Sequence, residues 1–354
     1  MNSVLLVLAC LAAPPAVVKS EPLPEWDARF RRTDGWVGGD GAYSVRTSDT
    51  RTLWLFSDTW VGSVRDGKRK DVTMVNNTVG VQDGEKLTFH IATKDGKPGT
   101  LFVPPDGKGW FWQFAGHLDG DKLHVFLPRF EKTNQPGAFG FKGVDLWLGT
   151  VPNSGDDPTK WTPTYAKVPF AEIGAKGSRS FGGGVLRVED WVYVYGYAET
   201  PGKPFASRTL LTARVPAGKL ADFAAWRFLA DGEWKPDAKD ATGQGSAIGT
   251  EFSVSFVPAL KQYALVYSEN GLSQRILGRF AASPGGPWSA PVLLHTCPEM
   301  KADKKVFTYA AKAHPHLSGE SELVVSYVVN SFDLAPVIND ATLYWPRFVR
   351  VTLK

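Results

Sequence analysis

The sequence predicts an all-β fold and, within that class, a five-bladed β-propeller. Short runs rich in Val, Tyr, Phe, Trp and Leu alternate with Gly, Pro, Asp and Asn along most of the 354 residues. This alternation is typical of sandwiches, barrels and propellers. Stretches with helical periodicity are nearly absent, and the best of them, residues 217–225, predicts only a short helix in a loop. The runs also fall into five groups.

The five groups recur at uneven intervals of roughly 50 to 70 residues, which fits propeller blades of four strands. Most groups begin with a strand of small residues and continue with an aromatic-rich partner. The predicted strands are residues 41–45, 52–60, 79–81 and 87–91; then 109–114, 122–128, 145–151 and a strand near Trp161; then 180–188, 191–197, 207–215 and 226–229; then 249–257, 262–268, 273–281 and 292–294; and finally 309–317, 322–328 and 344–352.

Small residues lead the groups for a steric reason, because the innermost strands of a propeller crowd around its axis. The pairs and triplets 38–39, 182–184, 246–247 and 310–311 suit that place. The last group lacks an outer strand, and we expect one chain terminus to supply it; the sequence leaves open which one. A β-sandwich or two small β domains are the alternatives, but a sandwich of this length would be large and no linker-like composition divides the chain.

Residues 1–20 have the character of a signal peptide, which leaves 21–354 as a single domain. The apolar run 4–13 is too short for a transmembrane helix. Two prolines follow it, and Val18 and Ser20 occupy the positions that signal peptidase reads. We therefore expect a secreted or periplasmic protein with no membrane span. Lipid attachment at Cys10 is the less favoured alternative, because it would require cleavage after only nine residues.

The charge and the cysteine content argue against a nucleic-acid-binding protein and against a disulfide-stabilised one. The formal net charge is +4, and apart from the run 65–70, which we interpret as a solvated loop, Lys and Arg are scattered. We therefore expect no nucleic-acid partner. Removal of the signal peptide would leave Cys297 as the single cysteine, so no intramolecular disulfide is expected. Stability would come from an aromatic-rich core in a chain that we expect to be monomeric.

Two aspartates are the strongest candidates for chemistry. Asp40 precedes the strand 41–45, and Asp58 lies near the end of its hairpin partner. If the turn is centred between Asp49 and Thr50, Asp40 lies opposite Asp58 or Thr59, with Cβ atoms about 5 Å apart. Carboxylates this close repel each other, so one pKa is raised unless a cation or hydrogen bonds intervene. Such a pair suits acid–base chemistry, cation binding or the binding of sugar hydroxyls, although aspartates at strand ends also bond to backbone amides.

Other residues are placed by the same reasoning. Glu251, early on the strand 249–257, would point into the same central pocket and is a candidate third catalytic acid, with a salt-bridged or rim glutamate as the alternative. Candidate substrate-binding residues lie at the starts of strands or beside them: Asn77, Arg179, Tyr309, Lys312, His314 and Trp60. His314 is more often a hydrogen-bonded core histidine than a ligand, and tryptophans such as Trp36, Trp60, Trp112 and Trp345 either stack on sugars or fill the space between blades.

The motifs of several other chemistries are missing from the sequence: a Gly-x-Ser-x-Gly elbow, a His-Glu-x-x-His zinc motif, a Walker loop and a Cys-x-x-Cys pair. We expect no required cofactor and no metal in the catalytic step. A structural calcium ion is compatible with the acidic residues.

The stretches Gly38–Ser44 and Leu53–Trp60, with residues 309–331, resemble exported bacterial proteins grouped as domain of unknown function family 4185 and its relatives. The resemblance implies a five-bladed propeller. Some members are endo-D-arabinanases of glycoside hydrolase family 183, whose important aspartates fall in the motifs that Asp40 and Asp58 match here. No third acid is carried over, so Glu251 depends on its position alone.

These observations favour an exported glycoside hydrolase that acts on a polysaccharide or glycoconjugate, arabinofuranosyl-type chains among them. The alternative is a non-catalytic carbohydrate-binding or cell-surface propeller, in which the aspartates hold sugar hydroxyls or calcium. A purely structural scaffold is the third hypothesis.

Overall fold

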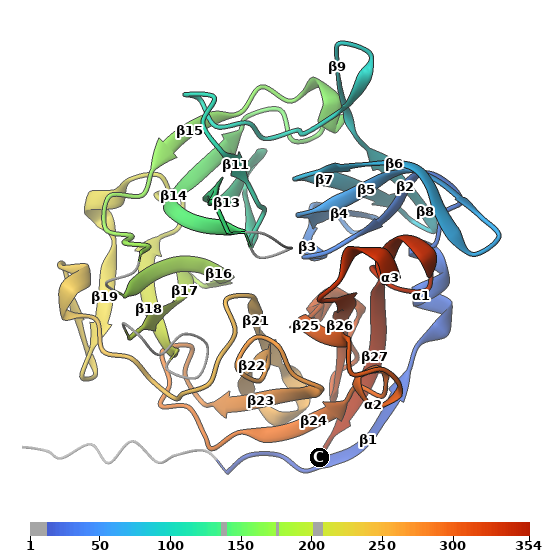
Figure 1. Ribbon diagram of the computed structural model, residues 1–354. Coiled ribbons are helices and arrows are strands. Elements are labelled where there is room, and N and C mark those ends of the chain that lie inside the picture. The colour runs from blue at the N-terminus through green and yellow to red at the C-terminus, as the bar shows by residue number, and fades with distance from the viewer. Residues whose placement is uncertain (1–12, 136–139, 175–176, 201–207) are drawn as a thin grey trace, which may run out of the picture.

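The computed structural model describes residues 13–135, 140–174, 177–200 and 208–354. Within these ranges the fold is all-β, as predicted, with few and short helices. Five antiparallel sheets of four or five strands succeed one another in chain order around a central axis (Figure 1). The described residues also form a three-stranded and a two-stranded sheet.

In four of the five larger sheets, the strand that comes first in chain order lies nearest the axis and its partners follow outward; in the fifth, β25 (Val306–Ala313) is innermost and the first strand, β1 (Val17–Pro22), is outermost. The first sheet is β3 (Tyr43–Arg46), β4 (Arg51–Phe56), β7 (Thr78–Asp83) and β8 (Lys86–His90). In the second, β11 (Trp110–Phe111) and β12 (Gly116–Asp119) both pair with β13 (Lys122–Lys132), followed by β14 (Phe141–Val151) and β15 (Thr164–Lys167). The third is β16 (Ser178–Val188), β17 (Trp191–Glu199), β18 (Thr209–Pro216), β19 (Arg227–Ala230) and β20 (Glu233–Lys235). The fourth is β21 (Phe252–Val257), β22 (Gln262–Ser268), β23 (Arg275–Ala281) and β24 (Val292–Thr296), and the fifth is β25 (Val306–Ala313), β26 (Glu322–Ser331), β27 (Pro346–Leu353) and β1 (Val17–Pro22).

The first hairpin departs from the prediction. The strand expected at 52–60 is interrupted at Ser57 and Asp58, and the chain continues in β5 (Thr59–Arg65). β5 pairs with β2 (Asp34–Gly39) and β6 (Lys68–Val75) in the three-stranded sheet, and β9 (Ala92–Lys94) with β10 (Lys97–Gly99) forms the two-stranded one. The interruption has a backbone cause, because Gly41 and Ala42 both have positive φ, +83° and +52°, which no regular strand allows.

The N-terminal segment supplies the missing outer strand of the last sheet. β1 pairs antiparallel with β27, with Ser20 opposite Val351 and Glu21 opposite Arg350. The backbones of Ala16 and Lys354 exchange two further hydrogen bonds of 2.9 Å. The predicted boundary after Ser20 therefore falls inside a paired strand. The predicted strand 207–215 begins at a residue outside the described ranges, and β18 begins at Thr209.

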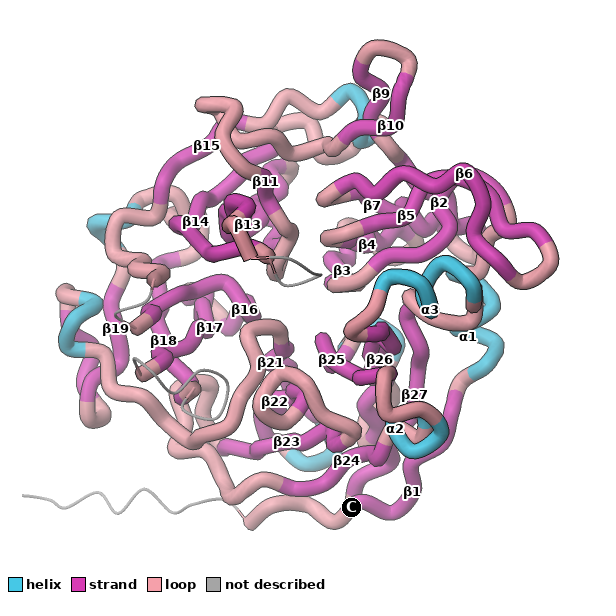
Figure 2. The backbone as a smooth tube through the Cα atoms, viewed as in Figure 1, coloured by secondary structure: helices cyan, strands magenta, loops and turns pink. Residues whose placement is uncertain are grey.

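The helices are short and gather beside the last sheet. α1 (Pro24–Phe30), α2 (Glu299–Ala302) and α3 (Leu334–Asn339) lie next to β25, β26 and β27 (Figure 2). Single turns of 3-10 helix lie at Pro158–Lys160, Phe223–Ala225, Ala238–Asp240, Pro258–Leu260 and Pro315–Leu317. The predicted loop helix at 217–225 is thus reduced to its last three residues, and the strand predicted to reach 317 ends at Ala313. No helix in the described ranges is long and apolar enough to cross a lipid bilayer.

Small residues line a crowded inner strand at 182–184, as predicted, although they lie in the middle of β16. Of the other predicted sets, 310–311 lie within the inner strand β25, whereas 38–39 end β2 of the three-stranded sheet and 246–247 lie outside any strand. A Cβ placed on Gly182 would lie 2.1 Å from the Phe126 ring, and one on Gly183 would lie 2.7 Å from the Phe252 ring. Both contacts are shorter than carbon atoms allow. β16 therefore packs directly between β13 and β21, and this close packing brings the inner strand starts toward one centre.

Candidate active site

Asp40 and Asp58 lie side by side at the interruption of the first hairpin. The register observed in β3 and β4 places Ser44 opposite Trp54 and Tyr43 opposite Leu55, and its extension places Asp40 opposite Asp58. The Asp40 amide donates to the Asp58 carbonyl oxygen at 3.1 Å, which confirms the predicted proximity. Because the ladder breaks here, the carboxylates project from irregular backbone instead of being part of a flat sheet.

Two tyrosines hold the Asp40 carboxylate. The hydroxyl of Tyr309, on β25, donates to Asp40 Oδ2 at 2.6 Å, and the hydroxyl of Tyr344 donates to the same oxygen at 3.0 Å. The other oxygen, Oδ1, is buried and has no hydrogen-bond partner. Asn330, near the end of β26, donates to the Tyr309 hydroxyl at 3.4 Å. One face of Asp40 is therefore fixed, while its second oxygen remains unpaired.

Asp58 is held from the other side. Asn76 Nδ2 and Trp112 Nε1 donate to Asp58 Oδ1 at 2.9 and 2.8 Å. The Trp112 ring is itself fixed by two phenylalanines of the second sheet, with ring centroids 4.1 Å from Phe130 and 5.0 Å from Phe141. Trp112 is thus the tryptophan, among those named from the sequence, that reaches the carboxylates.

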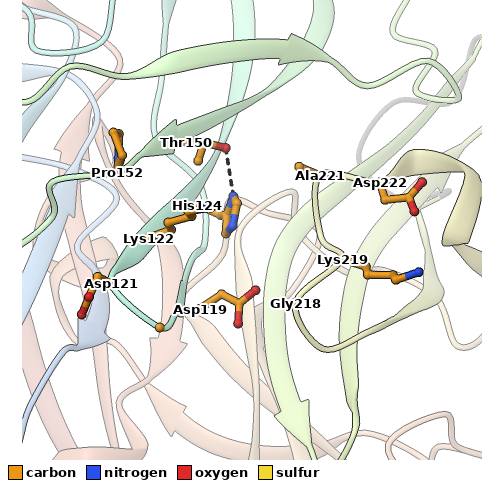
Figure 3. Close-up of a pocket in the computed structure, with 11 residues that line it drawn as sticks. Asp119, Asp121, Lys122, His124, Thr150, Pro152, Gly218, Lys219, Ala221 and Asp222 are labelled. Atoms are coloured by element: carbon orange, nitrogen blue, oxygen red, sulfur yellow. Dashed lines mark hydrogen bonds between the residues drawn. The ribbon is translucent and has the colours of Figure 1, made fainter.

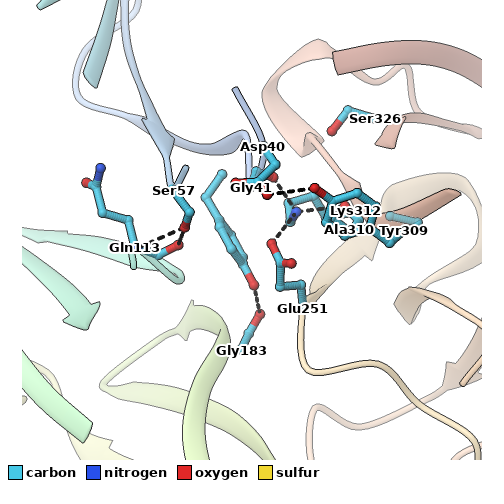
Figure 4. A network of polar contacts seen from close by, with 12 residues as sticks. Asp40, Gly41, Ser57, Gln113, Gly183, Glu251, Tyr309, Ala310, Lys312 and Ser326 are labelled. Atoms are coloured by element: carbon cyan, nitrogen blue, oxygen red, sulfur yellow. Dashed lines mark hydrogen bonds and ion pairs between the residues drawn. The ribbon is translucent and has the colours of Figure 1, made fainter. Parts of the chain in front are cut away.

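Glu251 joins the same network through a buried lysine (Figure 4). Lys312 Nζ lies 3.3 Å from Glu251 Oε1 and donates to the backbone oxygens of Gly41 and, at 2.7 Å, Ala310. The lysine side chain is 1% exposed and that of Glu251 is 17% exposed. The ammonium also lies 4.3 Å from the centroid of the Tyr43 ring. The structure therefore brings Asp40, Asp58, Glu251, Tyr309 and Lys312 together.

Burial and mutual repulsion raise the pKa values of the two aspartates. Burial raises the pKa of Asp40 well above its usual value, and the charges of Asp58 and Glu251 raise it further, against the lowering effect of the tyrosine hydroxyls. Burial raises the pKa of Asp58 to about 6, although the donors Asn76 and Trp112 oppose the shift. Burial lowers the pKa of Lys312, and the Glu251 carboxylate partly offsets this. The aspartate pair therefore retains a proton at pH values where ordinary aspartates are ionised.

Five residues predicted to bind substrate have other roles. Asn77 is fully buried and bonds through its amide to the backbones of Phe102 and Phe111. His314 is also fully buried, and its ring nitrogens bond to the hydroxyls of Ser44 and Ser326 at 2.7 and 2.8 Å. A side chain with no exposed surface and all polar atoms satisfied has nothing left for a ligand. Both predictions are corrected on that ground. So is the prediction for Lys312, because its side chain is 1% exposed and its ammonium already bonds to Glu251 and two backbone oxygens.

Arg179 and Trp60 are corrected for similar reasons. Arg179 forms an ion pair with Glu172 at 3.0 Å and donates to the Phe170 carbonyl oxygen, so its guanidinium is committed to the segment that precedes β16. Trp60 is 6% exposed and belongs to the hydrophobic core between the first and last sheets. Its ring fills space and offers no open face.

Sequence reasoning missed Tyr344 and assigned neither Asn76 nor Trp112 to Asp58. Tyr344 precedes β27 in a loop, and its φ of +65° is unusual for a residue with a side chain. No local sequence signal indicates such a conformation. Only the packing of this loop, 304 residues from Asp40, brings its hydroxyl to the carboxylate.

A cavity of about 630 Å³ lies elsewhere, at the opposite ends of the strands (Figure 3). It is lined by the turn from Asp119 to Lys122 and by the segment around Lys219, and His124 contacts Thr150 there at 3.0 Å. The β12–β13 turn is at the far end of β13 from Trp112, so this cavity is separate from the carboxylates. In the part of the chain that is described, no group of three or more His, Cys, Asp or Glu side chains is arranged to hold a metal ion.

Comparisons with solved structures support the fold. The "putative hydrolase" of Bacteroides ovatus ATCC 8483 has a TM-score of 0.74 and 20% identity over 94% of this chain and 90% of its own. The exo-β-1,3-galactanase of Phanerochaete chrysosporium has a TM-score of 0.49 and 11% identity, over 90% of this chain and 61% of its own. The GH43_1 enzyme of Xanthomonas citri, solved with xylotriose, has a TM-score of 0.47 and 12% identity, over 95% and 90%. At these last two scores the likeness adds nothing about function.

Comparison of sequences settles the family. No curated protein matches the chain. The model of a domain of unknown function, DUF5005, matches residues 24–353, whereas the resemblance to family 4185 is not shown by any match. Since that model spans nearly the whole sequence, the chain belongs to the DUF5005 family.

Proposed function

We propose that this protein is a glycoside hydrolase that acts on a polysaccharide or glycoconjugate, and that its five larger sheets are the blades of a five-bladed propeller. One observation carries the proposal: two half-buried aspartates lie together, one before the start of β3 and one after the end of β4, with raised pKa values and a third carboxylate nearby. Hydrolysis of a glycosidic bond typically uses a protonated carboxyl group on one side of the bond and an ionised carboxyl group on the other.

The geometry suggests how the roles divide. Repulsion between Asp40 and Asp58 keeps a proton on the pair, so one member protonates the leaving oxygen while the other, ionised, assists the attack on the anomeric carbon. Glu251 is tied to Lys312, so we assign it to holding the substrate and not to proton donation, the role that its position first indicated. Tyr309 and Tyr344 keep the Asp40 carboxyl in one orientation.

Two further points belong to the proposal. The resemblance to family 4185 leads us to place arabinofuranosyl polymers first among the test substrates. The apolar run 4–13 leads us to propose export. Because residues 17–20 are paired in β1, we propose that the mature chain keeps them, which mass spectrometry of its N-terminus will check.

The proposal is tested by a digestion screen over plant and bacterial-wall polysaccharides that measures reducing ends. Asp40→Asn and Asp58→Asn are expected to lower kcat about 1,000-fold or more while retaining the fold, because each removes an acid–base group. Asp49→Asn, at a turn residue whose side chain is 98% exposed, is the matched control and is expected to match wild type. Wild-type rates in both site variants would refute the proposal. Binding of a polysaccharide without release of reducing ends would favour a non-catalytic carbohydrate-binding protein.

A further inference from the structure

An aromatic row leads outward from the carboxylates along the last sheet. It begins at Tyr309, whose hydroxyl bonds to Asp40 at 2.6 Å. The Tyr309 ring contacts Phe307, also on β25, at a centroid separation of 5.4 Å, and Phe307 contacts Phe332 at 4.5 Å. Three rings therefore form a continuous series that starts at a candidate catalytic acid.

The outer end of the row is open to solvent. Phe332 is 47% exposed and Leu334, two residues later, is 57% exposed, whereas Phe307 beneath them is 3% exposed. Single exposed apolar side chains are common on protein surfaces. Here two large ones lie together on one segment, supported by a buried ring and connected to the site through Asn330, which bonds to the Tyr309 hydroxyl.

Polar groups border these apolar side chains. Asp333 lies between them in sequence and forms an ion pair with Lys305 at 3.6 Å, and Asn330 lies on the inner side. An aromatic face with polar neighbours is suited to a ligand that has both apolar C–H faces and hydroxyl groups. A sugar ring has this combination.

We propose that Phe332, with Leu334 beside it, binds sugar units of a polysaccharide chain that extends from the carboxylates over the last sheet. This inference rests on the proposed function and deepens it: the preferred substrate is a polymer, and its affinity depends on units beyond the one at the acids. A substrate with one sugar and a small leaving group does not reach Phe332.

The test compares Phe332→Ala with Phe256→Ala. Phe256 is a matched control, since it is 43% exposed, contacts the Tyr263 ring at 5.1 Å and lies near the end of β21 that is remote from Glu251. Phe332→Ala is expected to raise KM for the polysaccharide about fivefold without changing kcat. For an aryl glycoside of the same sugar, both KM and kcat are expected to stay unchanged. Phe332→Trp, which keeps an aromatic ring at this position, is expected to have the wild-type KM for the polysaccharide. Equal KM for the polymer in wild type and both alanine variants would overturn the inference.

Affinity electrophoresis in polysaccharide gels separates this inference from the proposed function, because it measures binding without turnover. Retardation that Phe332→Ala weakens and Phe256→Ala does not would support the binding surface, even if the wild type released no reducing ends. Hydrolysis by the wild type with retardation unaffected by Phe332→Ala would overturn the surface and leave the proposed function standing. Absence of both binding and hydrolysis over the whole screen would overturn both.

Discussion

Replacement of Asp58 by asparagine is expected to stabilise the protein at neutral and alkaline pH. Burial raises the pKa of Asp58 from 3.8 to about 6, so the folded chain holds this proton more tightly than the unfolded chain does. The difference corresponds to about 3 kcal/mol, at 1.36 kcal/mol for each pH unit. The stabilisation from the bound proton is fully present below about pH 3.8 and is lost as the pH rises through 6.

Asp58→Asn removes the charge and keeps the shape. Its amide oxygen still accepts from Asn76 and Trp112, and repulsion with Asp40 disappears. The variant is therefore expected to equal wild type in stability near pH 4 and to exceed it by about 1 to 3 kcal/mol at pH 8. Urea unfolding at pH 4, 6 and 8, with the midpoint compared at equal slope, measures the difference.

The same series includes Asp49→Asn, an exposed change whose effect is expected to stay within about 0.5 kcal/mol at all three pH values. A difference between wild type and Asp58→Asn that is the same at pH 4 and pH 8 would refute the burial argument. So would a variant that is less stable than wild type at pH 8.

Three further predictions concern the surroundings of the pair. Tyr344→Phe removes a donor that lowers the pKa of Asp40, so the pH–rate profile is expected to move toward higher pH; an unmoved profile would contradict this role. The guanidinium of Arg69, a residue that is 2% exposed, donates to four backbone carbonyl oxygens, and Arg69→Lys leaves several of them without a donor. Urea unfolding is expected to show that this change lowers the free energy of unfolding by about 2 to 4 kcal/mol. The exposed control, Arg65→Lys, is expected to lower it by about 0.5 kcal/mol or less. A chain that begins at Glu21 lacks most of β1 and is expected to be less stable by about 2 kcal/mol than one that keeps the strand, as measured by the same unfolding; equal stability would show that this edge pairing contributes little.

Local patterning was enough to predict most strands of the five larger sheets and the meeting of the two aspartates, but not the three-stranded sheet of β2, β5 and β6. Strand positions follow from the alternation of β-branched and aromatic residues with turn residues, which acts over a few positions. Asp40 and Asp58 meet because a single short turn joins their strands, and register in a hairpin is set by that turn. The predicted pairing was uncertain by one residue, and the observed register selects Asp58 over Thr59.

The burial of side chains was not predictable in this way. Asn77 directly precedes β7 and His314 directly follows β25, the strand that carries Tyr309 and Lys312, and nothing local distinguishes the two sets. Neighbouring sheets close over Asn77, His314 and Lys312 alike and satisfy their polar atoms, and Lys312 differs from the other two in its ion pair with Glu251. Arg179 differs again, since it forms an ion pair with Glu172 in the segment that precedes its own strand.

The sequence by itself thus determined an all-β chain in five strand groups, with two aspartates brought together by one hairpin, since these features depend on neighbours close in the chain. Tertiary structure alone decided that β1 completes the last sheet, that Lys312 reaches Glu251, and that Tyr344 bonds to Asp40. These contacts join residues 61 to more than 300 positions apart. Their geometry depends on how the sheets pack around the axis, which is the sum of many weak contacts and leaves no mark on any short stretch of sequence.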